Sequence, residues 1–431
     1  MSEAVCFTAE QLALCGIDNL PSELVSNKHL IYSSPATLAF NSPGAEGFGV
    51  KRAGLAIPGS VMLLVAPGCC GRNTSLISRM PEYDNRFFYL NMDETDVVTG
   101  RHLKKIPAAV KEICNCLPEK PSVVMICITC VDALLGTDME RVCRKAEEEA
   151  GVPVKPCYMY ALTREGRNPP MVHVRQSLYS LLKPRQRKGN AVNILGFFAP
   201  LNEDCELYDL LESAGVKNVR EISTCRDFAE YEKMAEANFN LVLNPEARFA
   251  AEDFYKNLGI PSIELTRFYE LDRIRKQYKA LGGALGTELD DEEFKLEVRK
   301  EIESFKAKHP SLKFAIGECM NGDPFELALA LIRYGYEVEE VYGTITVENY
   351  TFVKMLAELK PGLRIFSNME PTMINYDCSK ADVDVTIGKD AGYYHPSCPN
   401  LTWNSDRQPF GYRGVKAFFK ALDVLLEEAD V

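Results

Sequence analysis

A tight turn with two adjacent cysteines is the first place where the sequence could support chemistry. Cys69 and Cys70 stand between two glycines, directly after the hydrophobic run 61–66. If this run is a strand of an open parallel sheet, the turn lies beyond its carboxyl end, where such sheets bind ligands. Thiolates there could bind a metal or an iron–sulfur cluster. Adjacent residues point in different directions, so we expect one of the two thiols to serve a given site, and packing of either is the alternative.

A second cysteine pair, Cys127 and Cys130, falls within and after the apolar segment 122–128. The spacing is that of a zinc or thioredoxin-like motif, but residues three apart on a strand point to opposite faces. We therefore expect Cys127 to lie in the core. Cys130 ends the strand and would open a helix, whose N-terminus favours the thiolate that a cluster ligand needs. A buried, inert thiol is the alternative for Cys130.

Other motifs that carry chemistry are missing from the sequence. It contains no G-x-x-x-x-G-K-[ST] and no G-x-G-x-x-G after a strand, so any ATP chemistry must reside on another chain. The H-E-x-x-H and G-x-S-x-G motifs and paired C-x-x-C motifs are also absent, which excludes the commonest zinc and hydrolase sites. His395 and Cys398 could form a metal pair, but their loop is rich in Gly, Tyr and Pro, and we expect a local structural role.

Composition narrows the class of protein. The chain has 431 residues, enough for about three domains, and its formal net charge of −12 gives no electrostatic basis for binding nucleic acid. The N-terminal segment has no basic stretch followed by an apolar core, and no run of about 18 apolar residues occurs, so we expect a cytoplasmic protein without membrane spans. Disulfides are rare in that compartment, so the fifteen cysteines are expected to be core residues or ligands.

The elements that would position these cysteines alternate between strand-like and helix-like segments. Short runs rich in Val, Ile, Leu and Phe are followed by turn residues and then by helical spacing, which is typical of parallel sheets with helices on both faces. The expected strands are 61–66, 122–128, 192–198, 240–243, 313–316, 363–366 and 383–387. The expected helices include 206–214, 290–308 and 325–334. The fold class is therefore α/β.

Two boundaries divide the chain into three expected α/β domains. Residues 183–189 form a charged stretch with Pro and Gly between a helix-like segment and the next strand. A second boundary lies near Pro310, where a long charged helix ends and another strand begins. The expected domains are 1–189, which carries the cysteine turn, 190–311 and 312–431.

Three sequence blocks together resemble the component 1 proteins of nitrogenase. The segment 59–71 ends in Pro-Gly-Cys-Cys-Gly and resembles the turn that carries a P-cluster ligand in that family. Residues 93–104 resemble its Glu-x-Asp-x-Val-x-Gly stretch, and residues 129–138 resemble its Thr-Cys-x5-Gly-Asp-Asp motif, with Thr137 in the second-last place. The order and spacing of the blocks agree with the family. Further landmarks, which extend the resemblance over nearly the whole chain, lie at 240–242, 259–261 and 403–414.

The resemblance implies three Rossmann-like domains with mainly parallel sheets around a central cavity, an iron–sulfur cluster at a subunit interface, and reduction by a separate ATP-dependent iron protein. The chain departs from nitrogenase where that enzyme holds its iron–molybdenum cofactor. Residues 243–245 contain no cysteine, and Leu401 replaces the histidine two residues before Trp403. The family's first cluster cysteine, near the turn 42–44, is missing as well. We therefore expect a relative of nitrogenase that does not itself fix nitrogen.

The matches and gaps together predict the type of cluster. Cys70 and Cys130 match family cluster ligands, and Cys69 is the substitute for Cys70. Two ligands per chain across a two-fold interface make four, the number that a 4Fe–4S cluster requires. We hypothesise such a cluster, shared between two subunits of a homodimer or of a heterotetramer with a related component 1 chain.

Three functions fit the sequence. The leading hypothesis is a subunit of a nitrogenase-like oxidoreductase, which receives electrons from the iron protein and reduces an unidentified substrate in a cavity between the domains. Glu318 and Cys319 follow the strand at 313–316 and are candidates to line that cavity, although packing or an exposed turn is the expected role of both. The alternative is a scaffold for metallocluster assembly, as in the cofactor-assembly members of the family. The third function is a metal-free binding protein with cysteines in its core.

Overall fold

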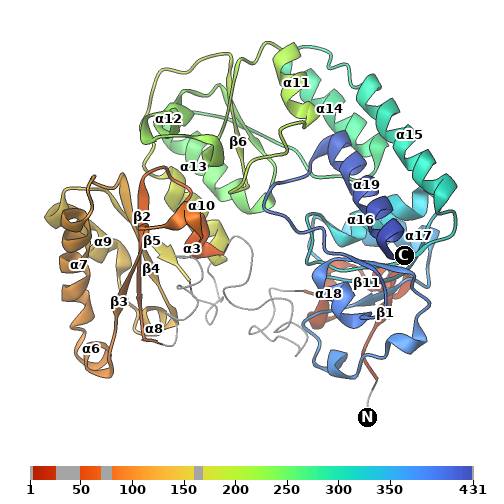
Figure 1. Cartoon of the computed structure of the whole chain (residues 1–431), viewed down its shortest axis with the longest axis horizontal. Helices are drawn as coiled ribbons and strands as arrows, with labels where there is room; N and C mark the ends of the chain where they lie inside the picture. Colours follow the sequence, from red (N-terminus) through yellow and green to blue (C-terminus); the bar gives the residue numbers. More distant parts are fainter. Residues whose placement is uncertain (1–2, 26–48, 69–79, 160–167, 430–431) are drawn as a thin grey trace. The chain divides into compact units, whose positions relative to one another are not determined.

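A computed structural model describes residues 3–25, 49–68, 80–159 and 168–429, and Figure 1 traces its elements. The chain divides into two compact units. Unit 1 comprises Met1–Ser42, Leu201–Gly215 and Thr266–Val431, and unit 2 comprises Pro43–Pro200 and Val216–Leu265. Parallel sheets flanked by helices build both units, which confirms the expected α/β class. Within the described ranges, no helix is long and apolar enough to cross a membrane.

Sheet I of unit 2 has four parallel strands in the order β3-β2-β4-β5. The strands are β2 (Ser60–Ala66), β3 (Phe87–Asn91), β4 (Val123–Ile128) and β5 (Val154–Tyr158). The two central strands, β2 and β4, are buried along their whole length, which explains their unbroken apolar sequences. The chain runs from β2 to β3 and then returns to add β4 on the other side of β2, so the topological switch point of sheet I lies between β2 and β4.

Alternation along β2 and β4 sorts their side chains onto the two faces of sheet I. Val61 and Leu63 lie in the core of one face, and Met62 and Leu64 in the core of the other. The covering helices are α7 (His102–Cys116) and α9 (Met139–Ala150) on the first face, and α3 (Val50–Ala53) and α10 (Pro170–Tyr179) on the second (Figure 1). Two short helices, α6 (Glu94–Thr99) and α8 (Cys130–Leu134), follow β3 and β4.

Sheet II, also in unit 2, has four parallel strands in the order β7-β6-β8-β9. The strands are β6 (Ala191–Leu195), β7 (Asn218–Glu221), β8 (Phe239–Val242) and β9 (Ser262–Glu264), and the helices with them include α12 (Phe228–Glu232) and α13 (Arg248–Leu258). β6 ends three residues before the end of the expected strand 192–198, because Gly196 turns the chain with a positive φ of 127°.

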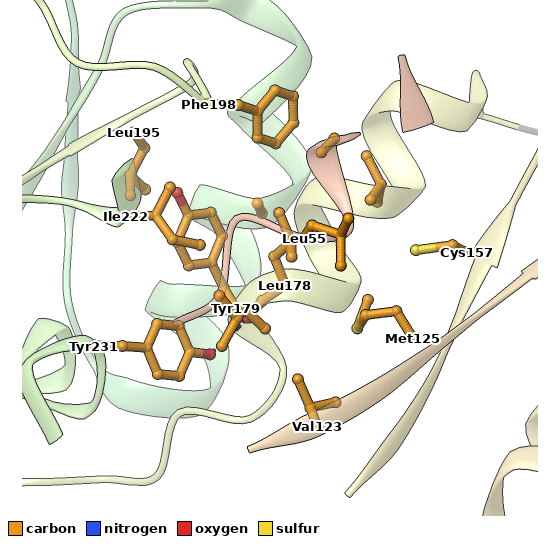
Figure 2. Close-up of a cluster of buried hydrophobic side chains, with 14 of the residues drawn as sticks. Leu55, Val123, Met125, Cys157, Leu178, Tyr179, Leu195, Phe198, Ile222 and Tyr231 are labelled. Carbon is orange, nitrogen blue, oxygen red and sulfur yellow. Dashed lines mark hydrogen bonds between the residues drawn. The ribbon is translucent and has the colours of Figure 1, made fainter. Parts of the chain in front are cut away.

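One hydrophobic core joins sheets I and II. Figure 2 shows Leu178 and Tyr179 of α10 between side chains of the two sheets. Those from sheet I include Val123, Met125 and Cys157, and those from sheet II and its connections include Leu195, Ile222 and Tyr231. The Tyr231 hydroxyl donates a hydrogen bond of 2.6 Å to the Leu178 carbonyl oxygen. The buried residues of sheets I and II are therefore continuous across residue 189, and the expected domain limits stay predictions.

Unit 1 contains sheet III, with the strand order β1-β12-β11-β10-β13-β14. All neighbours are parallel except β1 and β12. The strands are β1 (Phe7–Thr8), β10 (Lys313–Ile316), β11 (Glu337–Tyr342), β12 (Arg364–Phe366), β13 (Val385–Ile387) and β14 (Asn400–Leu401). The helices are α1 (Ala9–Cys15), α11 (Glu206–Ser213), α14 (Leu271–Leu285), α15 (Glu292–Lys308), α16 (Pro324–Arg333), α17 (Tyr350–Leu359), α18 (Lys389–Tyr394) and α19 (Gly411–Ala429). Its switch point lies between β10 and β13.

Candidate functional site

The switch point of sheet I is where both cysteine segments leave the sheet. β2 ends at Ala66 and β4 at Ile128, and the two strands are parallel neighbours with Val65 paired to Ile128. The segments that follow them therefore start from the same edge of the sheet. An open parallel sheet binds ligands in the crevice at this position.

The structure describes the predicted ligands to different extents. Cys69 and Cys70 lie outside the described residues. The backbone of Cys130 opens α8 directly after β4, as the sequence predicts. Cys127 is fully buried in the core shared with α10, which confirms the structural role expected for it.

A buried histidine–aspartate pair links the two family-like blocks that follow the cysteine turn. His102, the first residue of α7, places Nε2 3.0 Å from Oδ1 of Asp132 in α8. Its Nδ1 lies 3.1 Å from the backbone carbonyl oxygen of Asp96 in α6. The Thr137 hydroxyl donates to the same Oδ1 of Asp132 at 3.1 Å. One imidazole ring therefore connects α6, α7 and α8.

The partners of His102 determine where its protons lie. A carbonyl oxygen can only accept, so Nδ1 carries a hydrogen and donates to Asp96. Nε2 faces a carboxyl oxygen, so a second proton lies between Nε2 and Oδ1 of Asp132. Burial raises the pKa of Asp132, while the charge of His102 and the hydrogen bond from Thr137 act in the opposite direction. The two side chains therefore form a compact pair without net charge.

Two buried oxygens beside Cys130 have no hydrogen-bond partner in the part of the chain that the structure describes. They are Oδ2 of Asp132 and Oγ1 of Thr129. A buried polar atom without a partner costs about 1–3 kcal/mol, and folded proteins rarely leave one without a reason. These atoms flank the position at which the sequence predicts a cluster ligand. The described residues therefore leave two polar oxygens without a partner next to the predicted ligand Cys130.

Charged side chains fix the segment that precedes His102. Asp93 and Asp96 form a reciprocal capping box at the start of α6. The Lys105 Nζ and the Arg101 Nε lie 2.6 and 2.7 Å from the carboxylate of Asp96 and hold its pKa well below the usual range. Gly100 ends α6 in the left-handed conformation, with φ 66°, and lets the chain turn at once into α7. These contacts therefore fix the segment that positions the imidazole of His102.

Sequence reasoning did not single out His102 or Asp132. Both stand inside the blocks that resemble the family, but thirty positions separate them and no spacing rule relates them. The available signal is that His102 is one of only five histidines and lies within residues 93–104, which resemble the family.

The other twelve cysteines are free thiols in the described structure. Burial raises the pKa values of the Cys114, Cys143 and Cys157 thiols, so these groups are protonated and inert at neutral pH. In the same described ranges, no group of three or more His, Cys, Asp or Glu side chains could hold a metal ion. The thiols with described surroundings thus offer no competing cluster site.

The switch point of sheet III carries a carboxyl pair that shapes its own turn. The Asn368 amide donates to Glu318 at 2.9 Å and to Asp390 at 2.8 Å. The backbone N–H groups of Glu318 and Cys319 also donate to Asp390, at 2.8 and 3.1 Å. Burial raises the pKa values of both carboxyls, and the charge of Asp390 raises that of Glu318 further. These contacts hold the turn after β10, in line with the packing role expected for Glu318.

His395 belongs to a buried polar cluster in unit 1. Its Nε2 lies 2.9 Å from Oε2 of Glu340, a β11 residue with no exposed surface. The hydroxyls of Tyr342 and Tyr376 donate to the same oxygen at 2.5 and 2.6 Å. Oε1 of Glu340 forms an ion pair with Arg364 at 2.6 Å. The imidazole therefore has a structural carboxyl partner, as expected for a residue with a local structural role.

The sequence resemblance puts the two cofactor-ligand positions of nitrogenase at residues 243–245 and at Leu401. The Asn244 side chain accepts a hydrogen bond of 3.0 Å from the backbone N–H of Glu246 and so caps a short helix. Gly196 packs so closely that a Cβ there would lie 2.7 Å from the Asn244 nitrogen. Leu401 is a residue of β14 and pairs with Ile387.

Comparisons with known proteins identify the family. The model for nitrogenase component 1 type oxidoreductases matches residues 46–427, and the chain belongs to this family. This confirms the resemblance that the three sequence blocks indicate. A solved structure titled "Nitrogenase Cp1 at pH 6.5" has a TM-score of 0.69 and 17% identity, over 96% of this chain and 97% of that one, which shows the fold.

Curated relatives are nitrogenase iron-molybdenum cofactor biosynthesis proteins NifE. The protein of Nostoc sp. is 26% identical over 260 residues, which are 55% of this chain and 52% of the relative. That of Klebsiella pneumoniae is 27% identical over 237 residues, 51% of each chain. The chain thus spans about half the length of these two relatives. The protein of Sinorhizobium fredii is 24% identical over 425 residues, 91% of this chain and 83% of the relative.

Proposed function

We propose that the chain is a subunit of a nitrogenase-like oxidoreductase and that Cys70 and Cys130 bind an iron–sulfur cluster, with Cys69 as the substitute for Cys70. The observation that carries this proposal is the register of β2 and β4, because both cysteine segments start from one edge at the switch point of sheet I. Membership of the component 1 family supports it. The buried Thr129 hydroxyl beside Cys130 supports it further, because it has no hydrogen-bond partner in the described ranges and a hydroxyl can donate to a cluster sulfur.

The cluster proposed for this site is a 4Fe–4S cluster shared between two subunits. Two thiolates per chain supply half of the four ligands that such a cluster needs. Exposed apolar side chains on α6 and around the end of α8 support a subunit contact near this edge: Val98 is 85% exposed, Leu134 68% and Leu135 47%. The partner is a second copy of the chain or a related component 1 chain.

When bound, the cluster supplies low-potential electrons, and this chain contributes orientation and exclusion of water. The sequence has no phosphate-binding loop, so the ATP-dependent step belongs to a separate iron protein. The substrate is unidentified. Nitrogen fixation by this chain alone is not proposed, because residues 243–245 contain no cysteine and Leu401 stands where the resemblance implies a histidine ligand.

The ligand assignment is tested by anaerobic reconstitution with iron and sulfide. We expect about two iron atoms per wild-type chain and a 4Fe–4S signal in EPR after reduction. Cys70→Ala and Cys130→Ala should each lose most of the iron, and Cys127→Ala is the matched control that should keep it. A full cluster in both ligand variants, or a colourless and iron-free wild-type protein after strictly anaerobic purification, would contradict the proposal.

Assembly of a metallocluster is the second candidate function, and the similarity to NifE proteins favours it. An oxidoreductase subunit should be reduced by an iron protein with MgATP, which stopped-flow absorbance of the reconstituted cluster would follow. An assembly protein should instead transfer iron and sulfide to a cluster-free component 1 acceptor. Transfer without ATP-dependent reduction would replace the first function by the second.

A further inference from the structure

We propose that His102 and Asp132 are positioning residues for the cluster site, an inference that rests on the proposed ligand role of Cys130. Both side chains are almost completely buried, at 2% and 0% exposure. Asp132 follows Cys130 by two residues in α8, and His102 ties it to α6 and α7 through contacts of 3.0 and 3.1 Å. The pair therefore fixes the segment that carries the ligand.

The length of α8 explains why this segment needs an external support. The helix has five residues, and a helix this short is not stable without tertiary contacts. It ends in the exposed Leu134 and is followed by the exposed Leu135, and these side chains add little packing. The hydrogen bonds from His102 and Thr137 to Asp132 are therefore the polar contacts that hold its first turn.

The pair acts through the position of α8 and does not supply a further ligand. Positions 130 and 132 are two residues apart, and positions with this spacing do not share a face of a helix. Nε2 of His102 is occupied by Asp132, and Nδ1 by the Asp96 carbonyl oxygen. Oδ2 of Asp132 remains without a hydrogen bond in the described ranges and, unlike Oε1 of Glu340, without an ion pair there.

A double-mutant cycle on the reconstituted holoprotein tests the positioning role. Iron release to an excess of a ferrous chelator is followed for wild type, His102→Ala, Asp132→Ala and the double variant. Each single variant should release iron about tenfold to a hundredfold faster, by analogy with other outer-shell ligands. Because the two residues act as one unit, the double variant should be no faster than either single variant.

His395→Ala is the matched control, because it breaks the histidine–carboxyl pair of unit 1 and should leave iron release at the wild-type rate. His102→Gln keeps an N–H group toward Asp132, so it should give an intermediate rate. If His102→Ala does not fold, His102→Gln takes its place in the measurement of iron release. The melting temperature of the cluster-free proteins separates a local effect on iron release from general loss of stability.

The outcomes distinguish failure of this inference from failure of the ligand assignment. If Cys130→Ala loses the cluster while both alanine variants of the pair release iron at the wild-type rate, the positioning role is wrong and the ligand assignment stands. If Cys130→Ala keeps a full cluster, the ligand assignment itself is wrong. Additive effects in the double variant would also overturn the view that the pair is one unit.

Discussion

The protein buries two histidine–carboxyl pairs, one in each unit, and they differ in how the carboxyl group is used. In unit 1, His395, two tyrosines and an arginine surround both oxygens of Glu340. In unit 2, His102 and Thr137 share one oxygen of Asp132, and the other has no partner in the described ranges. Oε1 of Glu340 has no hydrogen bond but is paired with the charge of Arg364 at 2.6 Å, whereas Oδ2 of Asp132 has neither a hydrogen bond nor an ion pair in the described ranges, at the edge where the cysteine segments begin.

This difference indicates that the two carboxyl groups have different roles, one in stability and the other at the candidate site. A carboxylate with all its contacts inside the unit serves to hold that unit together, and its removal leaves several buried donors without an acceptor. A carboxyl with an open oxygen contributes less to the fold and is available to a site. The two pairs should therefore respond in opposite ways to substitution: the Glu340 pair through unfolding, and the Asp132 pair through the cluster.

The largest effect is expected from Glu340→Ala. The substitution leaves His395, Arg364 and two tyrosine hydroxyls without their common acceptor, so the free energy of unfolding should fall by about 3–5 kcal/mol. Guanidinium denaturation of the cluster-free protein measures this change. Iron bound per folded chain should stay at the wild-type value. A loss of stability below about 1 kcal/mol would show that the pair of His395 and Glu340 does not stabilise the fold.

The stability that Glu340 contributes should also depend on pH. Burial alone would raise its pKa, but hydrogen bonds from His395, Tyr342 and Tyr376 outweigh burial and leave the pKa below its ordinary value. The contribution is therefore complete above the unfolded-state pKa of about 4.3 and is lost as the pH falls through the lowered folded-state pKa. The stability difference between wild type and Glu340→Ala should shrink in denaturation series below about pH 4. A difference that widens there would refute this assignment.

A smaller effect is expected from Tyr376→Phe. Its hydroxyl donates to Glu340 at 2.6 Å, and the carboxylate keeps its other donors when this one is removed. The loss should be about 1.5–3 kcal/mol, as for one hydrogen bond to a charged group. The control is Tyr255→Phe, at a tyrosine that is 65% exposed, and its stability in the same denaturation assay should match wild type. Equal losses of stability in both variants would show that the hydrogen bond from Tyr376 to Glu340 does not stabilise the protein.

The smallest change in stability is expected from Asp132→Asn in the cluster-free protein. The amide N–H group can donate to Nε2 of a neutral imidazole, whose Nδ1 keeps its hydrogen bond to Asp96, and Oδ2 has no partner to lose. The free energy of unfolding should therefore change by less than about 1 kcal/mol. The measurement is the same guanidinium titration. A loss as large as that of Glu340→Ala would mean that both histidine–carboxyl pairs contribute equally to the stability of the fold.

The central strands could be predicted from the sequence because they are buried on both faces. The expected strand 313–316 agrees with β10, and 61–66 differs from β2 by one residue. The edge strands β5, β7 and β9 were missed because they contain polar residues or, in β5, a proline, whereas β3 was missed although only its last residue, Asn91, is polar. β11 is an interior strand, but its three glutamates, including the buried Glu340, hide it from a hydrophobic pattern.

The candidate site was predictable in part. The cysteine segments and the start of α8 followed from local motifs, because a strand, a turn and a helix start are encoded in neighbouring residues. The contact between His102 and Asp132 depends on how α7 and α8 meet across the edge of sheet I, and this is a property of the tertiary structure. Only an assembled sheet brings such residues together.

The pairing of β1 with β12 has a consequence for synthesis of the chain. Phe7 pairs with Ile365 and Thr8 with Arg364, so the first strand gains its partner only after more than three hundred further residues have been made. At about 5–20 residues per second, this takes roughly 20–70 s. During that time sheet I and its helices can form on the ribosome. β1 therefore waits for its place in sheet III until the strands of sheets I and II have all been made.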